Sequence, residues 1–545
     1  MLNLMMDDQL NISMVMEYAE QTAAHVEIVS VLSNGQQHRY TYADAFQRAR
    51  KLANALDQLQ IAAQEPVATL AWNDYRHFEL YYAVPCSGRI CHTINPRLFP
   101  EQIVYIIKHA KNRIVFLDPQ FVPLLEKIHS ELPLLQHIVV LCAADELPQS
   151  SLPNLISYEA LIATHPDSYM WPELDERTPS GLCYTSGTTG NPKGVLYSHR
   201  STLLHTLAGC LPNATNLSGA DVVLPIVPMF HVNAWGVPYS AAITGCKLVL
   251  PGNKAGDGAT LTALINQEQV TYAMGVPTVW LALVNHLESS GQQVSSLRRA
   301  VSGGAACPLA LIERMRAQGI DLEVGWGMTE TSPLGSYNRR QPWYDELPSE
   351  QYQRQVTLAG RQVFGIRLRI VSPDGQSLPR DGKASGILQA RGPWVACGYY
   401  GGTPSKGWFD TGDVATINPQ GYVCIVDRTK DVIKSGGEWI SSIDIENAVM
   451  AHPAVLEAAV IGLPHPTWSE RPLLVVVPRP THSVEPSELL EFLKDRVAKW
   501  WLPDLCILAE GLPHTATGKV SKKDLREQYQ EIQWPQSATQ SANAS

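Results

Sequence analysis

The most informative stretch of this chain runs from residue 184 to residue 194 and reads Tyr-Thr-Ser-Gly-Thr-Thr-Gly-Asn-Pro-Lys-Gly. Its hydroxyl side chains, accessible backbone N–H groups and lysine are the groups that hold a polyphosphate. It is not a Walker loop, because that motif places four residues between its first glycine and Gly-Lys-[Ser/Thr]. A flexible linker would not require Pro-Lys-Gly followed by an apolar strand. We therefore expect a phosphate-binding loop here.

Strand-like and helix-like segments alternate on the N-terminal side of this loop. Thr41 has the residue type of a helix N-cap, and after it apolar residues recur at three- and four-residue spacing from Phe46 to Leu56, as on the buried face of a helix. Such alternation is typical of α/β layers with parallel sheets. We expect strands at Val67–Trp72, Arg113–Asp118 and His137–Cys142.

The pattern changes on the C-terminal side of the loop. Arg299–Ser302 is predicted to be a strand that leads through two glycines into a helix opened by Pro308, and ligands usually sit at such a strand end. From about Ile366, short strands and turns predict a small antiparallel β region. After Arg428 the sequence predicts an α+β unit of about a hundred residues. Its expected elements are the helices Ser442–Ala451 and Ser487–Lys499 and the strands Val455–Ile461 and Leu473–Val477.

The composition excludes several classes of protein. Apolar residues make up 45% of the chain and charged residues 17%, so the chain as a whole is not disordered. The net charge of -10, from 42 basic and 52 acidic residues, would repel a phosphate backbone, and we expect no nucleic-acid partner. The ten cysteines form no C-x-x-C pair, which argues against a disulfide framework and a zinc site.

The N-terminus and the hydropathy pattern indicate a cytoplasmic protein. Residues 1–19 contain no basic residue, which fits neither a secretory signal nor a transit peptide. No apolar run approaches the roughly 20 residues that span a bilayer, so we expect no transmembrane segment. The cysteines are then interpreted as small buried side chains in a reducing compartment.

Five further motifs follow the loop in chain order. They are GWGMTE at 325–330, TGD at 411–413, DRTKD at 427–431, IKSGGE at 433–438 and TGK at 517–519. In this order the motifs resemble the adenylate-forming superfamily over nearly the whole chain. That superfamily includes acyl-CoA synthetases, peptide-synthetase adenylation domains and firefly-type luciferases. More narrowly, VPMFHVNAW at 227–235 and GEWIS at 437–441 resemble the bacterial medium- and long-chain fatty acyl-CoA synthetases.

The resemblance implies an architecture. The fold class would be α/β, with a large N-terminal domain (1–426) of layered α/β sheets plus a small β-barrel-like region. A hinge (427–431) would connect it to a small mobile α+β C-terminal domain (432–533). The tail 534–545 is rich in Ser, Ala and Gln and is predicted to be disordered. Long-chain relatives dimerise through the large domain, so a homodimer is compatible with the resemblance.

The resemblance also implies a reaction that joins a fatty acid, of medium chain length, to CoA. The carboxylate would attack the α-phosphorus of ATP, which gives an acyl-adenylate and pyrophosphate. The CoA thiol would then displace AMP. Because the first step brings an anion to a polyanion, positioning and charge neutralisation should supply most of the catalysis. Mg²⁺ would accompany ATP.

Residues for the nucleotide and its metal follow from the same resemblance. Thr185 and Glu330 would hold Mg²⁺. Asp413 would accept from the two ribose hydroxyls, Arg428 would contact the ribose or a phosphate, and Trp326 would stack on adenine where the family more often has Tyr. The residues expected around ATP or AMP are Thr185, Ser186, Gly187, Thr188, Thr189, Gly190, Lys193, Gly304, Ala305, Ala306, Gly325, Trp326, Gly327, Met328, Thr329, Asp413, Arg428 and Lys519.

The resemblance assigns catalytic roles to Lys519, Lys193 and Glu330. Lys519 would bridge the substrate carboxylate and the α-phosphate, and would leave when the C-terminal domain rotates about a hinge at Asp427 and Lys430. The acyl pocket would be formed by His231, Val232, Trp235, Gly303, Gly327 and Pro333. The CoA channel would be formed by Lys434, Gly436, Gly437, Glu438 and Trp439.

Each of these residue types also has an ordinary structural interpretation. A single glutamate such as Glu330 is more often a solvated or N-cap carboxylate, Trp326 fits a core, and Lys519 alone fits a surface lysine. The Phe-His-x-x-x-Trp stretch at 230–235 is equally typical of a core. In long-chain relatives, however, the tryptophan that matches Trp235 gates a fatty-acyl tunnel. Only the ordered set of motifs favours the functional interpretation.

Three functions remain open at this point. The first is an acyl-CoA ligase with soluble CoA, and within it short acids such as methylthiopropionate or butyrate are the alternative substrates. The second is an adenylating enzyme that loads a separate carrier protein. A fused carrier is not expected, because only 26 residues (545 minus 519) follow Lys519. The third is a non-catalytic binding protein or a luciferase-like oxygenase on the same scaffold.

Overall fold

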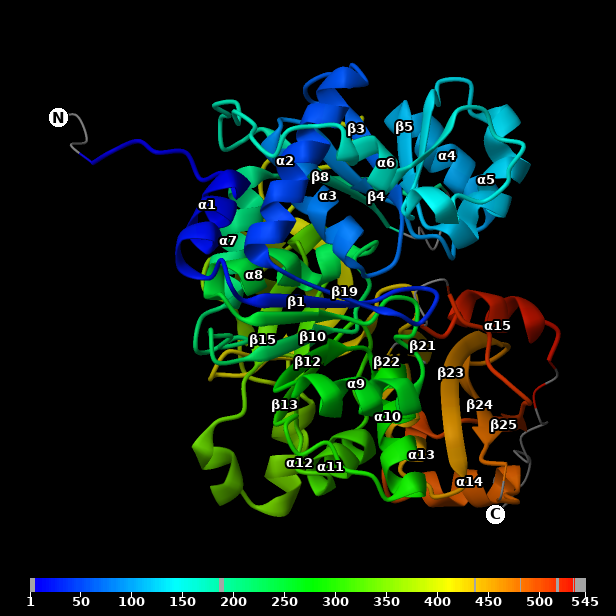
Figure 1. Ribbon diagram of the computed structural model, residues 1–545. Helices are drawn as coiled ribbons and strands as arrows, with labels where there is room; N and C mark the ends of the chain where they lie inside the picture. Colours follow the sequence, from blue (N-terminus) through cyan, green and yellow to red (C-terminus); the bar gives the residue numbers. More distant parts are fainter. Residues whose placement is uncertain are drawn as a thin grey trace, which may run out of the picture.

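The computed structural model describes residues 5–185, 191–435, 438–480, 482–515, 519–532 and 534. Three β-sheets organise these residues. In Figure 1 the two larger sheets form the blue-to-yellow body, and the third belongs to the C-terminal unit, drawn orange and red at the lower right. The architecture is α/β, as the sequence predicted.

The first sheet contains seven strands in the order β7-β6-β5-β3-β4-β8-β9. Neighbouring strands are parallel except for β8 and β9, which flank the phosphate-loop motif and run antiparallel. The three strands predicted in this region are confirmed with slightly different bounds. The strands are β3 (Pro66–Leu70), β4 (Ile90–Thr93), β5 (Ile114–Leu117), β6 (His137–Val140), β7 (Leu155–Ser157), β8 (Pro179–Tyr184) and β9 (Gly194–Ser198). The helices around them are α2 (Tyr42–Gln58), α3 (Tyr75–Cys86), α4 (Pro100–Ala110), α5 (Val122–Ile128) and α6 (Tyr158–Ala163).

Helix α2 begins where the sequence predicted it. The Thr41 side chain accepts a hydrogen bond from the Asp44 N–H, and the Asp44 carboxylate accepts one from the Thr41 N–H, which forms a capping box. The apolar face predicted from the spacing, with Phe46, Ala49 and Leu52, is fully buried. Helical periodicity and an N-cap were therefore sufficient to locate this element.

The second sheet contains thirteen strands in the order β17-β18-β19-β20-β16-β15-β14-β13-β12-β10-β11-β1-β2. The strands from β14 to β1 in that order are parallel, and those at both ends are antiparallel. The strands are β1 (Glu27–Val31), β2 (Gln37–Thr41), β10 (Val222–Pro225), β11 (Lys247–Leu250), β12 (Tyr272–Gly275), β13 (Arg299–Ser302), β14 (Asp321–Gly327), β15 (Leu334–Asn338), β16 (Gly360–Gln362), β17 (Arg367–Val371), β18 (Gly386–Arg391), β19 (Phe409–Ile417) and β20 (Tyr422–Arg428). The helices are α1 (Ile12–Thr22), α7 (His199–Gly209), α8 (Val237–Thr244), α9 (Gly258–Glu268), α10 (Pro277–Ser290), α11 (Leu309–Ala317) and α12 (Ser349–Thr357).

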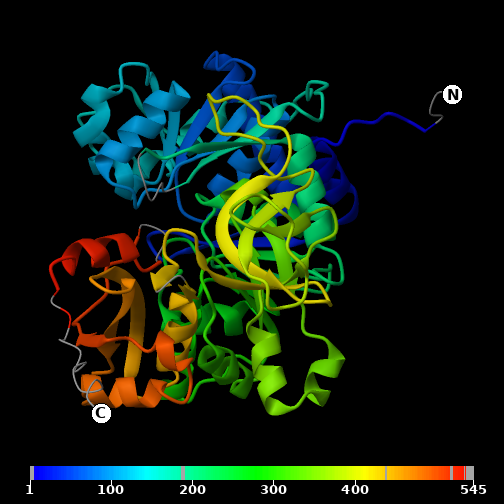
Figure 2. The same ribbon diagram turned by 180° about the vertical axis from the view of Figure 1, so that it is seen from behind.

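The antiparallel strands expected after Ile366 are present, but they do not close into a barrel. β20 pairs with β16 and β16 pairs with β15, so β17–β20 extend the open edge of the large sheet. Figure 2 shows these strands in yellow, curving across the back of the molecule. Local turn signals identified the strands, whereas their pairing depends on β15 and β16, which lie earlier in the chain.

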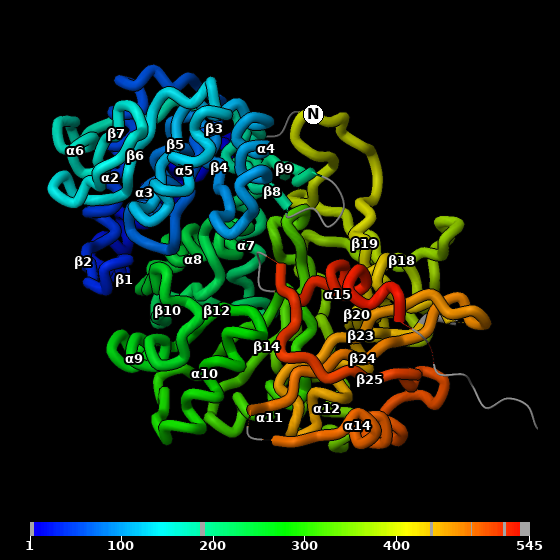
Figure 3. The backbone as a smooth tube through the Cα atoms, turned by 90° about the vertical axis from the view of Figure 1, so that its right-hand side faces the viewer, coloured from blue at the N-terminus to red at the C-terminus, as the bar shows by residue number. Residues whose placement is uncertain are grey.

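The C-terminal unit has its own sheet, with the order β22-β21-β24-β23 and β25 beside β24. Its elements are β21 (Ile433–Ser435), β22 (Glu438–Ile440), α13 (Ser442–Met450), β23 (Val455–His465), β24 (Ser469–Pro478), α14 (Pro486–Leu493), β25 (Leu505–Leu508) and α15 (Lys522–Gln528). The second predicted helix, Ser487–Lys499, was too long. Its buried face ends at Leu493, and the residues at 494–496 are exposed. Seen from the side, the unit lies over one flank of the second sheet (Figure 3).

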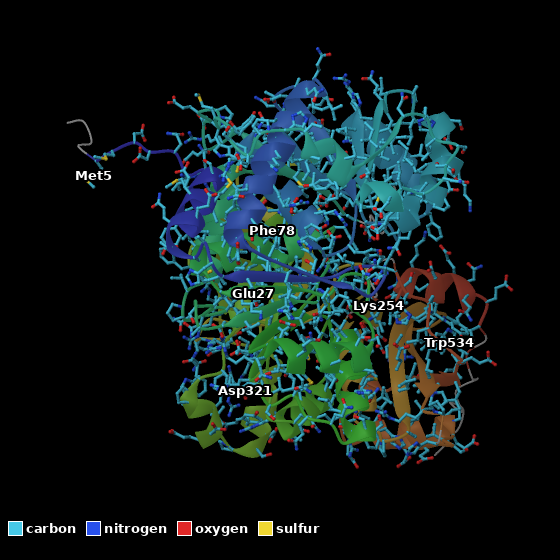
Figure 4. The ribbon with its side chains drawn as sticks, in the orientation of Figure 1. Met5, Glu27, Phe78, Lys254, Asp321 and Trp534 are labelled. Carbon is cyan, nitrogen blue, oxygen red and sulfur yellow. The ribbon has the colours of Figure 1, made fainter. Side chains whose placement is uncertain are left out.

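The exposure of apolar side chains differs between the core of the large domain and its N-terminal segment. Phe78 on α3 is fully buried, whereas Met5 is 78% exposed in the segment that projects from the body (Figure 4). Six cysteines are buried, as expected, but Cys397 is exposed. Among the residues that the structure describes, no helix combines the length and the apolar character needed to cross a bilayer.

Candidate active site

A cavity of about 920 Å³ lies between the second sheet, the C-terminal unit, and Thr185 and Lys193 from the segment between β8 and β9. This volume suits a small-molecule site. The carboxyl ends of the parallel strands β12 and β13 lead into it, as is usual for ligand sites of α/β sheets. The predicted residues that line it are Thr185, Lys193, His231, Val232, Trp235, Gly303, Gly304, Ala305, Ala306, Gly325, Trp326, Gly327, Met328, Thr329, Glu330, Pro333, Asp427, Arg428, Lys430 and Lys519.

Some predicted residues do not line the cavity or cannot be described. Asp413 lies behind the lining residues, and Lys434 is an exposed residue whose backbone N–H donates to Glu470 at 2.8 Å. Ser186, Gly187, Thr188, Thr189, Gly190, Gly436, Gly437, and the side chains of Glu438 and Trp439 lie outside the described residues. The contribution of the phosphate loop and of the CoA segment therefore stays a prediction.

Lys519 reaches the cavity from the C-terminal unit. A Cβ atom placed on Gly304 would lie 3.8 Å from the Lys519 Cε, which is an ordinary van der Waals distance, so the lysine side chain lies directly beside this backbone position. Burial and the neighbouring Arg428 cation lower the pKa of Lys519 to about 8, although Asp413 acts in the opposite direction. The lysine and the large-domain residues are thus already assembled in one closed site.

Asp413 and Arg428 face each other on the neighbouring strands β19 and β20. The Arg428 Nε lies 2.9 Å from Asp413 Oδ1, and the Trp326 indole N–H donates to Oδ2 at 2.9 Å. Burial raises the pKa of the Asp413 carboxyl, and both partners oppose that shift. Trp326 therefore does more than supply an aromatic face, because its N–H orients the carboxylate.

Lys193 and Glu330 are connected through Tyr399, which sequence reasoning missed. The Tyr399 hydroxyl donates to Glu330 Oε1 at 2.7 Å, and the Lys193 Nζ lies 5.0 Å from the centre of the tyrosine ring. The backbone carbonyl of Glu330 also accepts from the Ala396 N–H at 2.7 Å. Tyr399 follows a glycine in a loop, and nothing in the local sequence indicates that it meets a residue 69 positions earlier.

The segment 228–236 forms an unusual turn at the cavity wall. Residues from Val232 to Trp235 have φ between 45° and 57°, a left-handed conformation that costs free energy for side chains other than glycine. The turn presses the Trp235 ring against Gly303, where a Cβ atom would lie 2.8 Å from the indole Cη2. Nearby, burial and the Lys519 cation lower the pKa of His231 to about 4, which keeps that imidazole neutral.

Asn73, also missed from the sequence, fixes the chain before this turn. Its amide nitrogen donates to the carbonyl groups of Pro225 and Val227 at 3.0 and 2.8 Å, and its oxygen accepts from the Met229 N–H at 2.6 Å. Asn73 is 2% exposed and lies in the loop after β3. One buried amide thus holds three positions of a segment that starts 152 residues later.

The predicted hinge contacts both parts of the molecule. Asp427, at the end of β20, accepts hydrogen bonds from the N–H and the hydroxyl of Ser442 at the start of α13. Arg526 on α15 pairs with Asp431, and burial lowers the pKa of Lys430. These contacts hold the C-terminal unit in the position that brings Lys519 to the cavity.

Two protein families match this chain. The AMP-binding enzyme family matches residues 15–400, and the AMP-binding enzyme C-terminal domain matches residues 444–519. The chain is 47% identical over 537 residues to a medium-chain-fatty-acid–CoA ligase of Ectopseudomonas oleovorans, with 98% of both chains covered. It is also 47% identical to a 3-methylmercaptopropionyl-CoA ligase of Ruegeria lacuscaerulensis, with 97% of this chain and 99% of that protein covered.

The fold is similar to that of solved CoA ligases. The anthranilate CoA ligase AuaEII, in complex with anthranoyl-AMP, superposes with a TM-score of 0.84 and 25% sequence identity. The match covers 95% of this chain and 97% of that chain. The similarity extends through both the large domain and the C-terminal unit.

Replacing Trp326 by Phe tests the role of the indole N–H. The Trp326→Phe variant keeps an aromatic ring but leaves Asp413 without one of its two partners, so we expect the Kd for ATP to rise about 3- to 10-fold. Calorimetric titration with ATP measures this change. Trp394→Phe is the matched control, because its N–H donates to the carbonyl of Leu334 instead. An equal effect of Trp326→Phe in an Asp413→Asn background would contradict the assignment.

Proposed function

Because the chain belongs to the AMP-binding enzyme family, we propose that it is an AMP-forming acid–thiol ligase for medium-chain fatty acids. It converts the acid and ATP into acyl-adenylate and pyrophosphate, and then transfers the acyl group to CoA with release of AMP. The observation that carries the proposal is the position of Lys519, a C-terminal cation held beside Gly304 in a cavity formed mainly by the large domain.

In the first step, a carboxylate oxygen attacks the α-phosphorus of ATP and pyrophosphate leaves. Two like charges must approach each other, and Lys519 supplies a cation at the place where they would meet. Lys193 supplies a second cation for the triphosphate, and its Nζ already faces the Tyr399 ring. Arg428 adds a third, held in place by Asp413. Catalysis by positioned cations agrees with the general pattern of phosphoryl and nucleotidyl transfer.

Mg²⁺ fits the oxygen groups near the triphosphate position. The described residues contain no group of three or more His, Cys, Asp or Glu side chains able to hold a metal alone. The Thr185 hydroxyl and the Glu330 carboxylate both line the cavity. Mg²⁺ is commonly held by one or two protein oxygens together with substrate phosphates. When bound, it would neutralise phosphate charge, and Tyr399 would keep the Glu330 carboxylate turned toward it.

In the second step, the CoA sulfur attacks the acyl carbonyl carbon and AMP leaves. We propose that the C-terminal unit first rotates about residues 427–431, which withdraws Lys519 and brings the segment at 434–439 to the cavity. The contacts between Asp427 and Ser442 would break during this motion. A domain rotation about a few boundary residues is a common means of assembling a second site.

The acid is proposed to extend past Trp235 into the large domain. His231 is neutral, and the cavity lining includes apolar residues such as Leu334 and Val227. The similarity to the medium-chain-fatty-acid–CoA ligase of Ectopseudomonas oleovorans, which covers 98% of both chains, supports this substrate. The equally similar 3-methylmercaptopropionyl-CoA ligase supports a second candidate, a short acid with a thioether.

A chain-length series separates these substrates. We expect kcat/KM, measured at saturating CoA with straight acids from about 4 to 16 carbons, to peak at medium length, because each buried methylene contributes about 0.8 kcal/mol until the pocket is full. A maximum at four carbons or fewer would favour the short-acid alternative. Thioester formed on a pantetheinylated carrier protein but not on CoA would favour carrier loading. Absence of pyrophosphate release with every acid would reject the proposed function.

Removing the Lys519 cation should separate the two half-reactions. We expect Lys519→Ala to lower acyl-adenylate formation at least about a thousandfold, because the meeting of carboxylate and phosphate loses its neutralising charge. Thioester formation from supplied acyl-AMP and CoA should change much less. Pyrophosphate release measures the first reaction, and chromatography of acyl-CoA measures the second. Lys523→Ala, on α15, is a control for altered charge in the C-terminal unit. Equal losses in both assays would contradict the two-state mechanism.

The rate of adenylation should depend on the charge of Lys519. Its pKa near 8 means that the side chain is cationic below about pH 8 and neutral above it. We expect kcat/KM for adenylation to fall about tenfold per pH unit above pH 8. The Lys519→Arg variant should lose this fall, because a guanidinium stays charged. The measurement is pyrophosphate release without CoA between about pH 6.5 and 9.5. An identical fall in the variant would assign it to another group.

A further inference from the structure

His205, on helix α7, lines the same cavity as Trp235. The imidazole is 4% exposed, and its Nε2 lies 3.2 Å from the Leu334 N–H at the start of β15. The Leu334 carbonyl accepts in turn from the Trp394 indole. The histidine and this backbone position are therefore fixed relative to each other by a buried hydrogen bond.

The Leu334 N–H determines which nitrogen of His205 carries the proton. A backbone N–H can only donate, so Nε2 must be the acceptor, and a neutral imidazole then carries its hydrogen on Nδ1. Burial lowers the pKa of His205 to about 4, which keeps the ring neutral at physiological pH. The Nδ1–H is consequently an obligatory donor. Within the part of the chain that the structure describes, no acceptor for it is found.

The missing side chain of Gly236 leaves this donor open to the cavity. A Cβ atom on Gly236 would lie 3.1 Å from both Nδ1 and Cε1 of His205. Gly236 directly follows Trp235, whose ring contacts Gly303 on the nucleotide side. Lys519, Trp235 and His205 line one cavity, so an acyl chain bound in it can meet the Nδ1–H edge of His205. The hydroxyls of Thr206 and Thr215 donate to the carbonyls of Thr202 and Gly209, and among the described residues neither oxygen accepts a hydrogen bond from the imidazole.

From this geometry we infer that the acyl tunnel selects acids whose tail carries a hydrogen-bond acceptor, an ether, thioether, hydroxyl or carbonyl group, at the depth of His205. A plain alkyl tail would leave a buried donor without a partner, which is unfavourable. An acceptor at the matching position satisfies the donor. This inference rests on the proposed function and specifies its substrate class.

A scan of the tail position tests the inference. The substrates are octanoate and four analogues in which one methylene, at C4, C5, C6 or C7, is replaced by an ether oxygen. The measured quantity is kcat/KM for each analogue divided by kcat/KM for octanoate. We expect this ratio to be about fivefold higher at one position than at the others, the effect of one neutral hydrogen bond. Equal ratios at all four positions would overturn the inference.

Two substitutions at position 205 assign the effect to the Nδ1–H. The amide of His205→Asn lies close to the position of Nδ1 and should keep the positional preference. The longer amide of His205→Gln reaches the Nε2 position, so it can still accept from Leu334 but should lose the preference. Thr206→Val, which removes an adjacent hydroxyl already bonded to Thr202, should retain it.

The outcomes distinguish this inference from the proposed function. A preference that survives in His205→Gln would overturn the inference, even with normal turnover of octanoate. If that variant does not fold, the positional scan of the unmodified protein still decides, because it requires no substitution. Absence of pyrophosphate release with octanoate and all analogues would instead contradict the proposed function.

Discussion

The site depends on one constraint: a lysine from a small C-terminal unit must enter a cavity that already contains an arginine. The Lys519 ammonium is repelled by the Arg428 cation, and the buried Asp413 carboxylate, which pairs with Arg428, opposes this repulsion. Burial is the first cause of the low pKa of Lys519, and the Arg428 cation adds to it. The Lys519 ammonium also remains available to the substrates, because a cation that the protein compensates poorly gains the most free energy from binding anionic substrates.

The large domain prepares the place for this cation through backbone rather than side chains. Gly303 and Gly304 follow β13. The first leaves room for the Trp235 ring, and the Lys519 side chain lies beside the second. Parallel strands deliver both the glycines and the Trp326 segment to the same edge of the sheet, which is where α/β folds bind ligands. Asn73 then holds the segment before the left-handed turn, whose conformation needs such support from its surroundings.

Local patterns in the sequence predicted the elements that depend on local physics. The N-cap of α2, the β13 strand and the glycines after it were found because caps, periodicity and backbone freedom act over a few residues. The pairing of β20 with β16 was not found, because a turn motif says nothing about a partner strand elsewhere.

The site was also predicted only in part. Most of the predicted residues that the structure describes line the cavity, but the sequence did not identify the side chains that connect them. Tyr399 reaches Glu330, Asn73 reaches Met229, and His205 reaches Leu334, each across many residues of chain. Such contacts depend on tertiary packing and leave no pattern in the sequence. The cytoplasmic location, the homodimer and the domain bounds stay predictions.

The contact between Asp427 and Ser442 has a consequence for the rate of turnover. The carboxylate belongs to the large sheet and is 1% exposed. It accepts from the Arg428 N–H of its own strand and from the N–H and hydroxyl of Ser442, which begins a helix of the C-terminal unit. If that unit swings in every catalytic cycle, a desolvated charge must find water or a new donor each time. The lifetime of the closed form would then be set by the contact between Asp427 and Ser442 rather than by the chemical step at the α-phosphorus. Substitutions far from either substrate would therefore alter the turnover rate.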